Sequence, residues 1–176
     1  MRIASQGILN RNKEITFYFD SKPYKGFLGD TVASALLAND VHLVGRSFKY
    51  HRPRGILGIG SEEPNALISV HKGGRVEPNV RATVQEIYQG LIVTSQNSWP
   101  NLKFDALAIN DIAARFLSAG FYYKTFMWPP RFWEALYEPI IRRAAGLGRL
   151  DSKTDDDNYD QNFLFCDLLI IGGGPS

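Results

Sequence analysis

The chain has 176 residues, 44% of them hydrophobic and 22% charged, and carries a formal charge of +2 at pH 7. This composition is ordinary for a globular protein and excludes disorder of the whole chain, while the small net charge argues against a dedicated nucleic-acid binder. Its single cysteine, Cys166, excludes a disulfide framework and a cysteine-rich metal site. Because residues 1–10 lack a secretory signal and no apolar run reaches about 18 residues, we expect a soluble cytoplasmic protein that does not contact membranes.

The first hundred residues predict a small sheet around one helix. The stretch Glu14–Asp20 alternates in the manner of a strand, and the small apolar residues of Thr31–Asn39 predict a buried helix that follows an N-cap at Asp30. Two more strands are expected at Ala66–Val70 and Val80–Ile87. This order favours an α+β fold in which a β-grasp sheet wraps the helix.

Downstream of this sheet the pattern changes to that of helices. Apolar residues recur at helical spacing from Phe104 to Phe116, and a second helix is expected after Pro130, ending near Gly146. Five aspartates within residues 151–160 then predict a solvated linker. We therefore divide the chain into a β-grasp domain, a helical segment, an acidic linker and the start of a further domain, at residues 1–100, 101–150, 151–164 and 165–176.

The stretch Leu168–Ile171 is a short apolar run of the kind that forms the first strand of a Rossmann-type domain. Three glycines follow it, as in the opening of the G-x-G-x-x-G fingerprint that brings backbone amides close to a pyrophosphate. The third glycine, the phosphate-facing helix and the acidic ribose-binding residue would all come after the last residue, so we expect a fragment with an incomplete dinucleotide site. The candidate cofactor-binding residues are Gly172, Gly174, Pro175 and Ser176.

A basic loop spans Arg46–Gly55 with the sequence RSFKYHRPRG, in which arginines alternate with aromatic residues. Such residues bind phosphates and stacked bases, but they also form planar contacts at interfaces. Three interpretations stay open: a contact with a cofactor, domain or subunit, a solvated loop, or an RNA site. The first is favoured because the small net charge gives little long-range attraction for nucleic acid.

No catalytic or metal-binding group is expected from the sequence. The histidines lack paired ligands at metal spacing and are interpreted as loop or core residues, and Cys166 is expected to be buried beside the terminal strand. The adjacent Glu62 and Glu63 are poorly placed for paired acid–base work, so contacts within their loop are the better interpretation. The aromatic residues of Tyr122–Trp133 predict packing in a core or against a partner.

Three stretches carry a resemblance to a known family: GDTVASALLANDVHLVGRSFKYHRPRGILGIGSEEPNALISV, FLSAGFYYKTFMWPPRFWEALYEPIIRRAAGLGRL and CDLLIIGGGP. They resemble the N-terminal part of the alpha subunits of heterotetrameric sarcosine oxidases, and together they cover essentially the whole chain. The two long stretches are specific to these subunits, whereas the glycine motif is shared by many nucleotide-binding proteins.

The resemblance implies that the first domain is a ferredoxin-like 2Fe-2S module. An ungapped comparison with cluster-bearing relatives places the four cluster ligands at Gly58, Glu63, Ala66 and Thr83. Because none of these residues offers a thiolate, we expect a β-grasp domain that has lost its iron–sulfur cluster and binds no metal.

The resemblance also implies the function of the complete protein. It implies an oxidoreductase acting on CH–NH donors, which demethylates sarcosine to glycine with oxygen as acceptor and passes the methyl carbon to tetrahydrofolate. FAD and FMN are expected in the complex, NAD in the domain that begins near Gly172, and other subunits as partners. The fragment itself is expected to be inactive and to dock subunits. The alternative is a stand-alone β-grasp adaptor that binds a protein or RNA through its basic loop.

Overall fold

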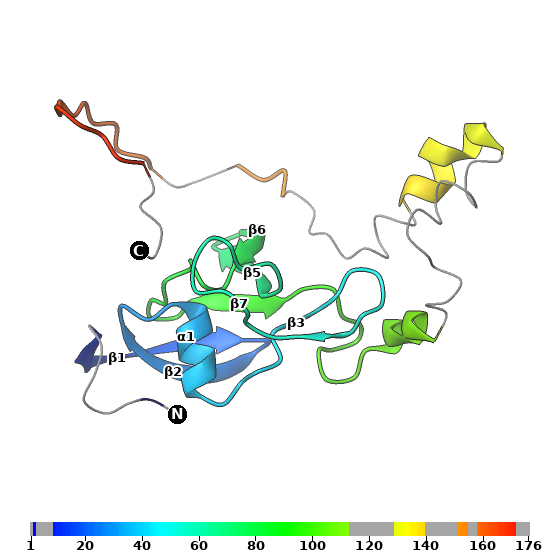
Figure 1. Cartoon of the computed structure of the whole chain (residues 1–176), viewed down its shortest axis with the longest axis horizontal. Coiled ribbons are helices and arrows are strands. Elements are labelled where there is room, and N and C mark those ends of the chain that lie inside the picture. The colour runs from blue at the N-terminus through cyan, green and yellow to red at the C-terminus, as the bar shows by residue number, and fades with distance from the viewer. Residues whose placement is uncertain (1, 3–8, 113–128, 140–150, 155–157, 172–176) are drawn as a thin grey trace.

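The computed structural model of the chain describes residues 2, 9–112, 129–139, 151–154 and 158–171. The residues up to 112 form a sheet with a helix packed against it, while residues 129–139 and 158–171 lie away from that sheet (Figure 1). The elements are β1 (Asn10–Phe19), β2 (Lys22–Leu28), α1 (Val32–Ala38), β3 (Gly45–Arg46), β4 (Pro53–Arg54), β5 (Leu67–Lys72), β6 (Arg75–Arg81) and β7 (Ile92–Ser95), followed by a 3₁₀-helix at Ala106–Asp111.

The main sheet is mixed, with the strand order β2-β1-β7-β5-β6. Strands β1 and β2 form an antiparallel hairpin, as do β5 and β6. The two hairpins are joined by β7, which runs parallel to β1 and antiparallel to β5. Strands β3 and β4 form a separate two-stranded ribbon, which carries the basic loop between its arms.

The hydrophobic core lies between α1 and one face of this sheet. On β1 the alternate residues Ile15, Phe17 and Phe19 are buried, as the period of two requires for a strand with one covered face. Strand β2 approaches the helix so closely at Gly26 that an added Cβ would lie 3.1 Å from the Cβ of Ala35. The other large members of the core are Val32, Leu36, Ile68, Val70, Leu91 and Val93.

The helix begins one residue later than predicted, because Thr31 and not Asp30 is its N-cap. Thr31 and Ser34 form a capping box in which each side chain binds the other residue's backbone amide. The carboxylate of Asp30 is buried and accepts hydrogen bonds from the Phe27 amide at 2.8 Å and the Ser34 hydroxyl at 2.6 Å, and it pairs with Arg2. Asp30 therefore fixes the chain just before the helix.

Two of the predicted strands are confirmed and one is largely wrong. Strand β1 contains the expected Glu14–Phe19, and β5 overlaps the expected Ala66–Val70, but Val80–Ile87 is a strand only as far as Arg81. Beyond Arg81 the backbone turns toward the helix, where the Ile87 amide donates to the Asp30 carbonyl at 2.9 Å. The apolar residues of this stretch therefore pack a turn against the core. The short strand β7 was not predicted.

Only parts of the two predicted helices are described, because residues 113–128 and 140–150 lie outside the described part of the chain. The described part of the first is the 3₁₀-helix after Asp105. The second begins at Pro130 as expected, first as a 3₁₀-helix over Pro130–Phe132 and then as a π-helix over Trp133–Tyr137. No helix among the described residues is long and apolar enough to cross a membrane.

The expected terminal strand at Leu168–Ile171 is not formed. These residues carry no strand assignment, and Leu168 and Ile171 are 76% and 87% exposed. A parallel strand exists only through hydrogen bonds to a neighbouring strand, and none of the described strands pairs with this run. Cys166, expected to be buried here, is exposed for the same reason.

Candidate functional site

The predicted cofactor-binding residues Gly172, Gly174, Pro175 and Ser176 lie outside the described residues. The polar features that the structure does describe are two neighbouring loops. The basic loop joins β3 to β4, and the loop of residues 57–66, here called the Glu63 loop, precedes β5.

Arg46 of the basic loop is used inside its own chain. Its guanidinium donates two hydrogen bonds to the Leu102 carbonyl, at 3.0 and 2.8 Å, and one to the His51 carbonyl at 3.0 Å. A guanidinium with three such carbonyl contacts holds the loop against the segment that follows β7. The interpretation of Arg46 as a residue that faces a cofactor or partner is therefore replaced by a structural role.

The two other arginines of this loop differ in their surroundings. Arg52 forms an ion pair with Asp111 at 2.7 Å and lies over the Tyr50 ring, 4.9 Å from its centroid. Arg54 is exposed, and its guanidinium has no hydrogen bond or ion pair within the described part of the chain. Arg54 is thus the arginine of this loop that is available for a contact outside the described residues.

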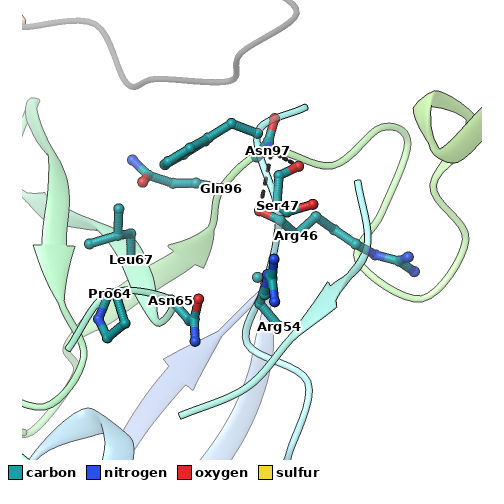
Figure 2. Close-up of a pocket in the computed structure, with 10 residues that line it drawn as sticks. Arg46, Ser47, Arg54, Pro64, Asn65, Leu67, Gln96 and Asn97 are labelled. Carbon is teal, nitrogen blue, oxygen red and sulfur yellow. Dashed lines mark hydrogen bonds between the residues drawn. The ribbon is translucent and has the colours of Figure 1, made fainter. Parts of the chain in front are cut away.

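A small cavity of about 120 Å³ lies beside Arg54, between the β3–β4 ribbon and the start of β5 (Figure 2). The Asn97 amide closes one side of it by donating to the carbonyls of Arg46 and Ser47, at 3.1 and 2.7 Å. Gln96 is buried and donates to Ser69, but its Oε1 atom has no hydrogen-bond partner among the described residues. The exposed Arg54 therefore gives the cavity one cationic group for a polar partner.

The histidines are confirmed as loop and core residues with local partners. His51 is fully buried and its Nδ1 lies 2.7 Å from Asp105, whose carboxylate also accepts from the Trp99 and Leu107 amides. His42 and His71 contact Asp40 and Thr94. No group of three or more His, Cys, Asp or Glu side chains among the described residues has the arrangement of a metal site.

The Glu63 loop is folded around a buried carboxylate. Glu63 is 1% exposed, and its two oxygens accept four hydrogen bonds from backbone amides of its own loop. One oxygen accepts from Leu57 and Gly58 at 2.7 and 2.5 Å, and the other from Asn65 and Ala66 at 2.7 and 3.1 Å. Sequence reasoning predicted a loop contact for Glu63, but not that the residue is buried or that it gathers four amides.

The pKa of the Glu63 carboxyl reflects two opposing effects. Burial raises it, but the hydrogen bonds from Asn65, Gly58, Leu57 and Ala66 together lower it more, so that the pKa lies below its usual value. The side chain is therefore a carboxylate at neutral pH. A carboxylate with four amide donors stabilises a tight loop that would otherwise hold unpaired backbone groups.

Comparison with known proteins gives one family and several relatives. Residues 12–98 match the family described as a 2Fe-2S iron-sulfur cluster binding domain. The sarcosine oxidase alpha subunit of Rhizobium meliloti is 59% identical over 99% of this chain, which spans 18% of that subunit. The alpha subunit of Corynebacterium sp. strain U-96 is 30% identical over 96% of the chain, which spans 13% of it. The chain thus matches only a small part of each relative.

Among the solved structures, the L-proline dehydrogenase of P. horikoshii matches with a TM-score of 0.41 and 23% identity, over 55% of this chain and 18% of that one. A similarity of this size carries no argument. The sequence matches, in contrast, confirm the resemblance to sarcosine oxidase alpha subunits, and they show that residues 12–98 are similar to 2Fe-2S iron-sulfur cluster binding domains.

The residues present do not fit the cluster that this domain family binds. Iron–sulfur clusters need thiolate ligands, or in some centres imidazoles, and residues 12–98 contain no cysteine. A Cβ added at Gly58 would lie 2.8 Å from a carboxylate oxygen of Glu62, so the Glu62 side chain would have to move to admit a cysteine there.

Proposed function

We propose that this chain, which is similar to sarcosine oxidase alpha subunits over 99% of its length, is the N-terminal docking part of such a subunit. The identity of 59% to the Rhizobium meliloti subunit is the observation that carries the proposal. The chain contributes a ferredoxin-like domain without a cluster, and its own role is structural.

At the level of the complete enzyme, the proposed reaction is the oxidative demethylation of sarcosine to glycine in the cytoplasm. Oxygen is the acceptor, tetrahydrofolate takes up the methyl carbon, and the complex holds FAD, FMN and NAD. Within this chain, Gly172, Gly174, Pro175 and Ser176 are proposed to begin the NAD site, because closely spaced glycines let backbone amides approach a pyrophosphate.

The fold of the first domain, within residues 1–100, is proposed to be a β-grasp. Two β-hairpins joined through a parallel pair of central strands, with one helix across the sheet, support this proposal. The helical segment at 101–150, the acidic linker at 151–164 and the start of a Rossmann-type domain at 165–176 remain the proposed division of the rest.

Arg54 and the adjoining cavity are the proposed docking surface for another part of the enzyme. Arg46 and Arg52 are bound by their own chain, which leaves Arg54 with an exposed guanidinium at the cavity. Arginine suits a planar contact that loses water on assembly. A neighbouring aromatic side chain, Phe48, is 40% exposed and can pack against the same partner.

The test is the assembly of the complete enzyme with Arg54→Ala in the alpha subunit. We expect subunit association weakened by roughly 1–3 kcal/mol, measured by mass photometry over a dilution series. Arg52→Ala is the matched control in the same loop, and it should assemble normally because Arg52 contacts Asp111 of its own chain.

If the Arg54→Ala enzyme has normal subunit stoichiometry and normal flavin and NAD content, Arg54 does not dock another part of the enzyme. If the unmodified chain then bound RNA tightly with a steep salt dependence, the alternative of a basic-loop adaptor would be correct.

A further inference from the structure

The four positions expected to hold cluster cysteines lie together in the structure. Gly58, Glu63, Ala66 and Thr83 have the spacing of the plant-type pattern C-x₄-C-x₂-C…C. Thr83 comes from the turn after β6 and its hydroxyl donates to the Gly60 carbonyl at 2.7 Å, which brings the fourth position onto the Glu63 loop. The chain has therefore kept the arrangement of a cluster loop while it has lost every ligand.

A loop of this kind directs several backbone amides toward its interior. In a cluster-bearing domain, an anionic cluster and its sulfurs accept such hydrogen bonds. Without an anion, four inward amides would be buried donors without partners, each of which destabilises a fold by about 1–3 kcal/mol. Some other acceptor must be present for the loop to keep this form.

The Glu63 carboxylate meets this requirement in position, charge and number of acceptor sites. It belongs to a residue at one of the four ligand positions, and it accepts from Gly58 and Ala66, which occupy two of the others. A carboxylate accepts up to about four hydrogen bonds, so the Leu57 and Asn65 amides complete its capacity.

The charged groups around Glu63 do not offer a different explanation. The adjacent Glu62 is exposed, and its carboxylate accepts from the Ile59 and Gly60 amides. Arg81 contacts only the backbone carbonyl of Glu63, at 3.2 Å. The buried negative charge is therefore held by amides rather than by an ion pair.

We infer that the Glu63 carboxylate has taken the place of the iron–sulfur cluster as the internal anion around which this loop folds, and that the domain thereby keeps its ferredoxin-like shape without metal. The inference rests on the 2Fe-2S domain match and the loop geometry, and it holds whether or not the chain docks subunits of a sarcosine oxidase.

Amide hydrogen exchange on the intact chain tests this directly. In Glu63→Gln, which keeps the size of the side chain, we expect the amides of Leu57, Gly58, Asn65 and Ala66 to exchange at least tenfold faster. In Glu62→Gln these four amides should keep their protection, and the core amides of Ile68 and Val70 should stay protected in both variants. Unchanged protection of the four amides in Glu63→Gln would overturn the inference.

Restoring the thiols gives an independent test by iron and acid-labile sulfide content. With Gly58→Cys, Glu63→Cys, Ala66→Cys and Thr83→Cys together, incubation with ferric iron and sulfide should load a 2Fe-2S cluster. The matched variant that retains Glu63 and carries the other three changes should load none. Three results would each contradict the inference that the Glu63 carboxylate replaces the cluster. They are equal loading of the two variants, loading of the unmodified chain, and no loading of a folded four-cysteine variant.

Discussion

The sheet region at residues 10–111 and the described residues 158–171 use similar amino acids with opposite results. In the first region, apolar side chains such as Phe17 and Leu36 are fully buried. In the second, Phe163, Phe165 and Ile171 are 92%, 100% and 87% exposed. Apolar composition alone therefore does not produce an element of structure. A strand forms where a neighbouring strand pairs with it and a second surface covers its apolar face.

The difference supports the proposal that the second region is completed by other parts of a longer subunit. An exposed apolar run of this length marks a surface that other protein covers. Asp151 illustrates the boundary, since its carboxylate still accepts from the Val76 amide of β6 at 3.1 Å. Past that contact, the described residues carry no strand or helix.

The largest effect is expected for a large-to-small change in the sheet region. Phe17→Ala should lower the free energy of unfolding by about 3–5 kcal/mol, because it removes a fully buried ring and leaves a cavity against Tyr24 and the helix. Chemical denaturation followed by circular dichroism measures this.

The matched control for Phe17→Ala is Phe163→Ala, which removes the same ring from a residue that is 92% exposed. Its unfolding free energy should change little. Comparable losses in the two variants would contradict the division of the molecule into a packed and an uncovered region.

Much of the fold of the sheet region could be predicted, because its elements follow local patterns. The alternation in β1 and the small apolar residues of α1 each depend on one covered face, which the sequence records directly. Strand β7 was missed because it is only four residues long and ends in Thr94 and Ser95. The strand at Leu168–Ile171 was wrongly expected because periodicity describes a residue run and not the partner that the run needs.

The candidate site was less predictable than the fold. The cluster positions could be located from spacing and resemblance, and the loss of the cysteines was visible there. Two features depend on the tertiary structure: the burial of Glu63, and the difference between Arg46, which binds carbonyls of its own chain, and the exposed Arg54. A glutamate within a glycine-rich loop at a former ligand position is the one signal that could have indicated the internal carboxylate.

An intermediate effect is expected from lowering the pH, and we expect Asp30 and Glu63 of the sheet region to account for most of it. Burial raises the pKa of Asp30, but hydrogen bonds from Arg2, Ser34 and the Phe27 amide together lower it by more than burial raises it. The pKa of Glu63 is lowered in the same way by its four amide donors. Because both pKa values in the folded state lie below those of the unfolded chain, their stabilisation is present above about pH 4.5 and is lost as the pH falls through the folded values.

Thermal unfolding between pH 6 and pH 3 should therefore show a decrease in stability that is shallower in Glu63→Gln. The exposed Glu62→Gln should change the slope less, since solvent already screens its charge. A slope in Glu63→Gln as steep as in the unmodified chain would mean that other carboxylates dominate the acid response.

The smallest effect on stability is expected from substitutions in the C-terminal residues. These substitutions test the comparison between the packed sheet region and the uncovered residues. Phe165→Ser with Ile170→Ser should change the unfolding free energy by less than about 0.5 kcal/mol, because these side chains are 100% and 73% exposed and contribute no buried contact. The same pair should reduce self-association of the chain, measured by analytical ultracentrifugation, because an uncovered apolar run promotes association. The result distinguishes an apolar run that packs on its own chain from one that another part of the subunit covers. If the double variant loses more than about 1 kcal/mol while the protein is monomeric, the run packs on its own chain, and the proposal that another part of the subunit covers it would be wrong.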